Sequence, residues 1–568
     1  MRNIYILLFF ALSINLSYGQ QLSDEEILNQ LYENDGEQYF SFELNDLSKL
    51  NDLSRMISID KIDGYGKVYA YANRKGFSKF LSLKTEYKIL PHPGDYEGFL
   101  NMMSNIDVRE IEEWDFYPTY DAYVDMMYQF AEDYPSLCQV FSIGTSIQGR
   151  EILFAKISDN IGINENEPEF LYTSSIHGDE LTGYILMLRL IDYLLSNYGT
   201  DPRITGMVDN IEIWINPLSN PDGTYAGGNN TVNGARRFNY NWVDLNRNYP
   251  DPEDGPHPDG EEWQKETELF MQLAEENHFV SSVNFHGGTE VCNYPWDTWS
   301  RLSADDAWWQ YVCREYADTA HLYAPPDYMN EYDNGITNGY AWYTVAGGRQ
   351  DYMNFFHQDR EFTLEISDVK LIDPSLLPAH WNYNYRSLLN YIEQSTFGVR
   401  GTVKDSITGW PIRAEVYAVL HELDSSWVYS SLPNGNYHRL LYEGTYNLRY
   451  SAPGYQTKVI YNVPVVNRQA TVLDVKLIPD GVGGISNYGV SEKINISPNP
   501  VTGDNLAIES ELEISRITIY DLNGKKLSEQ VFSGSKGLIN LDLVNNGMYF
   551  IRFDTEKGIG IRKFVISR

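Results

Sequence analysis

Cysteine is scarce in this chain. Its 568 residues include only Cys138, Cys292 and Cys313, and no two of them stand in a Cys-x-x-Cys pair. An odd number of cysteines cannot pair completely, which excludes a dense disulfide framework. A bridge between Cys292 and Cys313 and three buried free thiols both remain open.

Positive charge is also in short supply. Lysine and arginine number 43 against 79 aspartates and glutamates, so the formal net charge is −36. Such a surface repels phosphate and gains nothing from counterion release, which excludes nucleic acid as a partner. The same charge favours solubility and would attract cationic substrates.

Long hydrophobic runs are missing beyond the N-terminus. Arg2 is followed by an apolar run over residues 4–16 and then by Ser17-Tyr18-Gly19, the pattern of a signal peptide over residues 1–19. A buried N-terminal helix is the alternative. No later segment has the roughly 20 apolar residues that a transmembrane helix needs. We therefore expect a soluble mature protein outside the inner membrane.

The chain is too long for one hydrophobic core, so several domains are expected. Within residues 115–397, strand-like and helical runs alternate, which predicts an α/β domain with a central mixed sheet flanked by helices. Shorter strands separated by turns follow and indicate β-sandwiches. The predicted segments are a signal peptide (1–19), a small α+β module (20–110), the α/β domain (111–397), a β-sandwich (398–479), a Gly-rich linker (480–493) and a second β-domain (494–568).

One cluster suggests a metal site. His177-Gly178-Asp179-Glu180 follows a predicted strand and precedes a predicted helix. An imidazole and a carboxylate in one turn can reach the same Zn²⁺ ion, which needs three protein ligands in a catalytic site. A surface turn capped by Asp179 or Glu180 is the plainer interpretation.

Two further strands strengthen the metal hypothesis. His286 ends the predicted strand 282–285 and precedes two glycines, which allow close backbone approach. His286 would supply the third ligand. Glu365 stands in an otherwise apolar strand, where a carboxylate is costly unless it is paired or functional. A general base beside a metal site is such a function.

Asn246-Arg247 lies in the stretch DLNRNYP and is preceded by Arg236-Arg237. An arginine fork with an adjacent amide can hold a carboxylate. Salt bridges to nearby acidic residues are the alternative.

These motifs resemble the zinc carboxypeptidases of peptidase family M14. The ordered stretches are HGDE, DLNRNYP, NFHGGTEVCNYPWD, TNGYAWYTVAGGRQDY and FTLEIS, within residues 115–397. The likeness is strongest to the subfamily of carboxypeptidases N, E, M and D. It implies a secreted enzyme that hydrolyses the C-terminal peptide bond of peptides or proteins and holds one zinc ion per catalytic domain.

The resemblance also assigns roles to residues. It implies that His177, Glu180 and His286 bind zinc and that Glu365 is the base that activates the zinc-bound water. Arg237, rather than Arg236, would polarise the scissile carbonyl. The terminal carboxylate would be bound by the remaining matched residues, Asn246, Arg247 and Tyr343.

Specificity follows from the same likeness. Asp297 matches the residue that recognises C-terminal Arg or Lys in this subfamily, and Gln350 matches a second residue of that pocket. Arg349 stands where the subfamily has Met, and it would weaken the basic preference if it turned towards Asp297. Broad or aliphatic specificity, trimming of cell-wall peptides, and a non-catalytic peptide-binding protein on the same fold are the alternatives.

The flanking segments resemble known companions of this domain. Residues 20–110 resemble a propeptide-like module, and residues 398–479 resemble a transthyretin-like domain. Residues 494–568, with ISPNP and IYDLNGKKL, resemble the C-terminal sorting domain of type IX secretion. That likeness implies the type IX machinery as a partner and export through the periplasm and outer membrane to the surface or the medium. Generic adhesive β-sandwiches are the alternative.

Overall fold

The computed structural model describes the chain except for residues 1–21, 34–35, 45, 47–48, 64–65 and 481–489. The predicted signal peptide, residues 1–19, and most of the predicted linker lie outside the described residues. The chain divides into two compact units, residues 1–92 and 93–568. No helix in the described part is both long and apolar enough to cross a membrane.

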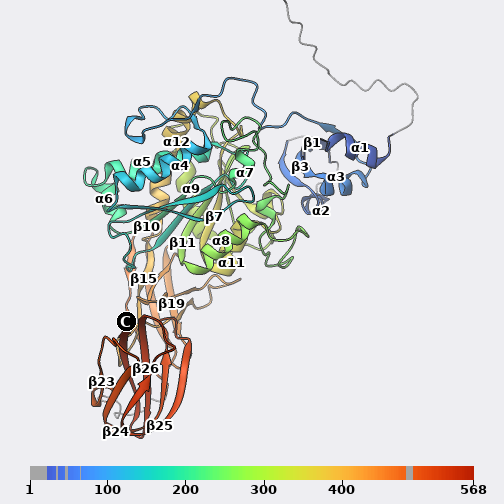
Figure 1. The fold of residues 1–568 in the computed structure, drawn as a ribbon. Coiled ribbons are helices and arrows are strands. Elements are labelled where there is room, and N and C mark those ends of the chain that lie inside the picture. Colours follow the sequence, from blue (N-terminus) through green and yellow to red (C-terminus); the bar gives the residue numbers. More distant parts are fainter. Residues whose placement is uncertain (1–21, 34–35, 45, 47–48, 64–65, 481–489) are drawn as a thin grey trace, which may run out of the picture. The chain divides into compact units, whose positions relative to one another are not determined.

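The first unit is a small α+β module (Figure 1). Its antiparallel sheet has the order β2-β3-β1-β4. Alternation along β1 places Phe40 and Phe42 against Phe77 and Phe80 of the helix that follows β3, which forms the core of the module. The elements are α1 (Asp24–Leu31), β1 (Glu37–Glu43), α2 (Leu50–Ser54), β2 (Ser58–Ile62), β3 (Lys67–Asn73), α3 (Arg74–Leu81) and β4 (Tyr87–Ile89).

The second unit is built on an eight-stranded mixed sheet, which confirms the predicted α/β class. The parallel strands β14, β11, β9 and β10 lie at its centre, with antiparallel strands towards both edges. In sheet order the strands are β13 (Ile336–Asn338), β12 (Thr289–Tyr294), β14 (Arg360–Ser367), β11 (Phe279–His286), β9 (Glu169–Ser174), β10 (Glu212–Asn216), β8 (Glu151–Ile157) and β7 (Cys138–Thr145).

Helices cover both faces of this sheet (Figure 1). Successive strand residues point to opposite faces, so Tyr172 packs in one core cluster and its neighbour Leu171 in another. The larger core lies under α4 (Tyr120–Asp133), α5 (Thr182–Asn197), α9 (Asp306–His321) and α12 (Leu377–Gln394). The smaller core lies under α8 (Lys265–Glu276) and α11 (Arg349–His357).

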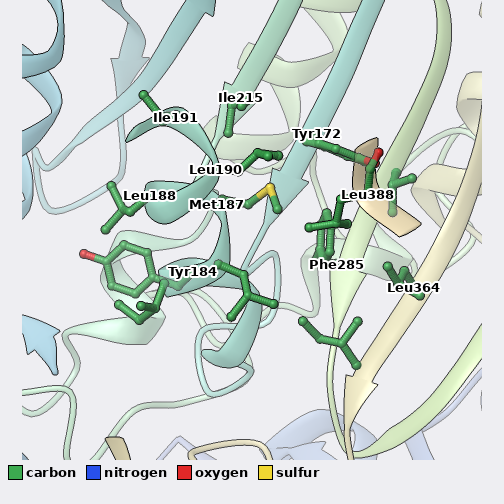
Figure 2. Close-up of a cluster of buried hydrophobic side chains, with 14 of the residues drawn as sticks. Tyr172, Tyr184, Met187, Leu188, Leu190, Ile191, Ile215, Phe285, Leu364 and Leu388 are labelled. Atoms are coloured by element: carbon green, nitrogen blue, oxygen red, sulfur yellow. The ribbon is translucent and has the colours of Figure 1, made fainter. Parts of the chain in front are cut away.

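Helix α5 packs against the strands β9 and β11. Figure 2 shows its residues Met187 and Leu190 beside the strand residues Tyr172 and Phe285, while the ring of Tyr184 points to the other side of the helix. All five side chains are at most 1% exposed, so the ends of β9 and β11 are fixed by close packing rather than by loop contacts.

The boundary between the units lies earlier than the sequence analysis placed it. Residues 93–110 were predicted to belong to the N-terminal module, but Leu100 and Val108 are buried in the large core of the second unit. The short strand β5 (Met102–Met103) pairs with β6 (Tyr117–Pro118). The segment has no strong periodicity, so its attachment depends on contacts that are distant in sequence.

Two β-rich segments complete the chain. Residues 398–480 form two sheets around one core, and residues 490–568 form a five-stranded sheet around another. The first contains β15 (Gly398–Asp405), β16 (Glu415–Ala418), β17 (Val428–Tyr429), β18 (Asn436–Arg439), β19 (Gly444–Ser451), β20 (Lys458–Val465), β21 (Ala470–Val472) and β22 (Val475–Leu477). The second contains β23 (Ile494–Ser497), β24 (Asn505–Tyr520), β25 (Lys526–Asn540), β26 (Gly547–Thr555) and β27 (Gly558–Ile566).

The three cysteines are buried free thiols, so the structure contains no Cys292–Cys313 bridge. Cys138 begins β7, Cys292 lies on β12 and Cys313 lies on α9. Burial raises the pKa of Cys138 to about 12, which keeps this thiol protonated and unreactive at neutral pH.

Candidate metal centre and active site

The three predicted metal ligands lie together at the carboxyl ends of two parallel strands. β9 and β11 are neighbours with Phe285 opposite Ser174, so the turn after β9 meets the last residue of β11. The Nδ1 atoms of His177 and His286 are 3.0 Å apart. The Glu180 carboxylate lies 3.1 Å from Nδ1 of His177 and 2.9 Å from Nδ1 of His286.

This arrangement fits a zinc ion. Bonds of about 2.0–2.1 Å in a tetrahedron place ligand atoms about 3.3 Å apart, close to the separations seen. Burial lowers the pKa of His286 to about 4, so its ring is neutral at pH 7, as a ligand must be. A side chain at Gly178 would approach Gly223 and Thr224 backbone atoms to 2.4 Å, so only glycine allows this turn.

Asp244 orients the first ligand. Nε2 of His177 donates to Oδ1 of Asp244 at 3.0 Å, which leaves the Nδ1 lone pair directed at the cluster. Burial opposes the charge on Asp244, but Arg237, His177 and Arg247 together hold its pKa well below the usual range. Asp244 is therefore an anion that fixes the tautomer of His177.

Two cations flank the carboxylate of Glu180. Arg237 donates to Oε1 at 3.2 Å, and the ammonium group of Lys370 donates to the same atom at 2.6 Å. Burial opposes ionisation, but His177, Lys370 and His286 outweigh it and hold the pKa of Glu180 well below its usual range. Sequence reasoning missed Lys370. In the sequence, Lys370 is marked only by its position shortly after the strand that carries Glu365.

The two consecutive arginines, Arg236 and Arg237, have different partners. Arg237 is 3% exposed and also donates through Nε to Oδ2 of Asp244 at 3.1 Å. Arg236 forms an ion pair with Asp95 at 2.8 Å instead. Of the two, Arg237 therefore lies at the metal centre.

Glu365 lies beside the ligands by strand register. β14 pairs with β11 in parallel, and Glu365 is directly opposite His286. Glu365 is 9% exposed, so its carboxyl group lies in a largely buried position beside His286.

Arg247 is close enough to Asp244 and to Asp297 for its charge to act on both. Its charge lowers the pKa of both Asp244 and Asp297. It is 7% exposed and donates through Nη1 to the Asn246 carbonyl at 2.8 Å, yet its Nε and Nη2 have no partner among the described residues. A buried guanidinium with open donors is suited to a carboxylate ligand. The Asn246 side-chain oxygen accepts from the backbone N–H of Arg349 at 2.9 Å, which orients that amide.

Asp297 forms a second anionic site with Asn293 and Gln350. Nδ2 of Asn293 donates to Oδ1 of Asp297 at 3.0 Å, and Gln350 is buried nearby with its amide nitrogen unpaired among the described residues. Burial raises the pKa of Asp297 to about 6. A Cβ at Gly339 would lie 1.8 Å from Oδ1 of Asp297, so glycine is required there.

Asp351 fixes the backbone of Asp297 by hydrogen bonds. Its carboxyl oxygens accept from the backbone N–H of Asp297 at 3.1 Å and of Thr298 at 2.8 Å. Burial and the nearby charge of Asp297 raise the pKa of Asp351 well above its usual value. Sequence reasoning missed this residue too, although it directly follows Gln350.

Arg349 does not reach Asp297. Its guanidinium pairs with Glu361, from Nε to Oε1 at 3.1 Å and from Nη2 to Oε2 at 2.8 Å. Both side chains are at most 2% exposed. The orientation in which Arg349 neutralises Asp297 is therefore wrong, because Glu361 on β14 supplies its counter-charge.

Tyr343 follows the short helix α10 (Gly339–Trp342), and its ring packs against Trp342 at 4.9 Å. The residues predicted from motifs thus form two linked groups. The first is the metal centre with Arg237 and Glu365, the second is the Asp297 site, and the charge of Arg247 acts on both groups.

Three families match successive parts of the chain. The zinc carboxypeptidase family matches residues 123–387. A carboxypeptidase regulatory-like domain matches residues 398–478, and a secretion system C-terminal sorting domain matches residues 495–567.

Individual relatives agree with these matches. Carboxypeptidase D of Mus musculus is 38% identical over 365 residues, which cover 62% of this chain and 26% of that protein. The chain thus spans about a quarter of that relative's length. Carboxypeptidase M of Mus musculus is 35% identical over 58% of this chain and 76% of that protein. The carboxypeptidase N catalytic chain of Mus musculus is 32% identical over 63% of this chain and 85% of that protein. Because the matches to carboxypeptidase M and to the carboxypeptidase N catalytic chain each cover more than three quarters of the relative, the chain belongs to the zinc carboxypeptidase family.

Proposed function

We propose that the protein removes a single C-terminal Arg or Lys residue from peptides or proteins by hydrolysis. The observation that carries the proposal is the position of Arg247. Its Nε and Nη2 are open donors, and its charge acts both on Asp244, which hydrogen-bonds the His-Glu-His cluster, and on the buried carboxyl group of Asp297. A terminal residue with a free carboxylate and a cationic side chain matches these two charges.

One group of residues binds the terminal carboxylate of the substrate. Arg247 and Asn246 bind the terminal carboxylate, and Tyr343 closes over it. Such positioning can supply on the order of 7–11 kcal/mol in favourable cases. This clamp restricts cleavage to the last peptide bond.

Glu365 performs the proton transfer. It takes a proton from the attacking water and returns it to the leaving amine. Arg237 donates to the oxygen of the scissile carbonyl as negative charge develops there, a contribution of about 3–4 kcal/mol for one preorganised donor. A zinc ion held by His177, Glu180 and His286 would act as a Lewis acid and lower the pKa of water at this place.

Basic specificity rests on Asp297. Because Arg349 is paired with Glu361, it does not compete with the substrate side chain for Asp297. The neutral donor Asn293 orients the carboxyl group of Asp297 without cancelling its charge.

Export is part of the same proposal. The match of residues 495–567 to a secretion system C-terminal sorting domain supports recognition by the type IX machinery and release at the cell surface or into the medium. Such a location would expose the enzyme to extracellular peptides.

Peptides that differ only in the last residue test the proposal. We expect cleavage after C-terminal Arg or Lys, slower cleavage with C-terminal Leu or Phe, and none when the terminal carboxylate is an amide. Equal or faster release of Leu or Phe would contradict basic specificity and favour the broad alternative. Cleavage of the amide would contradict the role of Arg247.

A further inference from the structure

The loop between α9 and β13 is held in an unusual backbone conformation. Three of its residues that are not glycine have left-handed φ angles: Met329 at 52°, Tyr332 at 57° and Asn334 at 50°. Such angles are unfavourable for residues with a side chain, so they persist only where surrounding contacts impose them. Strained positions of this kind cluster at functional sites.

Fixed contacts hold the loop on both sides of Tyr332. The Met329 N–H donates to Glu290 at 3.1 Å, and its carbonyl lies 3.0 Å from Nε2 of His321. On the other side, Arg314 donates to the carbonyl of Asn334 at 2.7 Å. The tip that carries Tyr332 is therefore anchored.

Arg314 also neutralises one acidic residue of the loop. It donates to the side chain of Asp333 at 2.8 Å and to its carbonyl at 2.5 Å. Asp333 is therefore a paired anion next to Tyr332.

Tyr332 continues a row of rings that ends at Tyr343. Its ring centroid lies 5.4 Å from that of Trp342, and Trp342 lies 4.9 Å from Tyr343. Tyr332 is nevertheless 43% exposed, so part of its ring faces solvent.

The side chain of Tyr332 also lies near Glu365. Desolvation raises the pKa of Tyr332, and negative charge on Tyr343, Glu331 and Glu365 raises it further. Tyr332 thus lies on the side of Tyr343 and Glu365, whereas the Asp297 site would hold the terminal side chain.

We propose that Tyr332 and Trp342 form a binding subsite for the side chain of the penultimate residue of the substrate, and that this subsite favours aromatic and other large apolar side chains. The inference rests on the proposed function, because it needs a bound peptide whose last residue lies at Asp297. The penultimate side chain leaves the scissile bond on the side opposite the terminal residue. There a large apolar group gains contact with the exposed part of an already ordered ring.

The test uses the full chain and two N-blocked peptides ending in Phe-Arg and Ala-Arg. We expect Tyr332→Ala to lower kcat/KM for the Phe-Arg peptide on the order of 10-fold and to leave the Ala-Arg peptide within about 2-fold. Tyr332→Phe keeps the ring and should retain the preference for Phe-Arg. Tyr461→Ala, at a 68% exposed tyrosine on β20, is the matched control and should change neither peptide.

Three other outcomes would contradict the subsite, its apolar preference or the proposed function. Equal losses on both peptides would mean that Tyr332 only supports the loop, which overturns the subsite. A loss confined to a peptide with a basic penultimate residue would overturn the apolar preference. If the wild-type protein cleaves neither peptide, the proposed function itself fails, whatever Tyr332 does.

Discussion

Arg349 and Glu361 form a buried, two-pronged ion pair beneath the Asp297 site, with Nη2 and Oε2 2.8 Å apart. Removal of one partner from such a pair leaves an uncompensated buried charge. We therefore expect Arg349→Met to lower the free energy of unfolding by about 3–5 kcal/mol. It should leave the ratio of kcat/KM for C-terminal Arg over Leu unchanged, because the guanidinium does not face Asp297. Urea unfolding and peptide kinetics measure the two quantities.

The matched control for this change is the double variant Arg349→Met with Glu361→Gln. It removes both charges and should recover part of the lost stability. A tenfold rise in preference for C-terminal Arg in the single variant would show that Arg349 does oppose Asp297.

Asp297 is the predicted counter-charge of the substrate side chain. Asp297→Asn keeps the shape of the side chain and removes the charge. Loss of one partner of a buried charge pair costs about 2 kcal/mol or more, so kcat/KM for a C-terminal Arg peptide should fall at least about 30-fold. The matched Leu peptide should change little. A parallel fall with both peptides would mean that the variant disturbs the whole site.

The raised pKa of Asp297 predicts that specificity depends on pH. Burial raises this pKa to about 6, so the free enzyme holds a charged carboxylate above pH 6 and a neutral acid below it. The ratio of kcat/KM for Arg over Leu should therefore fall as the pH drops through about 6. The same ratio should be flat with pH in Asp297→Asn. A wild-type ratio independent of pH between 5 and 8 would contradict the assignment.

A buried charge network joins the catalytic domain to the regulatory-like domain. Arg439 of β18 is fully buried and donates to Asp305, at the start of α9, and to Glu422, both at 2.9 Å. We expect Arg439→Met to cost about 3–5 kcal/mol, because two carboxylates would remain buried with fewer partners. Arg468 pairs with Glu315, and its side chain is 44% exposed, so Arg468→Met should cost no more than about 1 kcal/mol. Similar losses in the two variants would contradict this difference.

The proposed metal ligands could be named from the sequence because weak local patterns and the family resemblance point to the same three residues. His177 and His286 each follow a strand-like apolar run, and parallel neighbouring strands end at the same edge of a sheet. Glu365 was recognisable as a charged residue inside an apolar strand. The strand register in the structure places it directly opposite His286.

Other features depended on contacts between distant segments. The direction of Arg349 is set by Glu361, twelve residues later and on a different element. The contact of Lys370 with Glu180 joins residues 190 positions apart. The boundary at His92 depended on which core buries Leu100. Periodicity within a window describes the faces of one element, but it cannot identify the partner of a side chain.

The central claim is that Glu365 performs proton transfer beside a zinc ion held by His177, Glu180 and His286. Glu365→Gln changes the base without removing a proposed ligand, so the most direct measurement follows zinc content and hydrolysis of a C-terminal Arg peptide in the same preparation. The account predicts about one zinc ion per chain, as in the wild type, with kcat lowered by about 10²–10⁴-fold. Zinc retained together with nearly wild-type hydrolysis would contradict it.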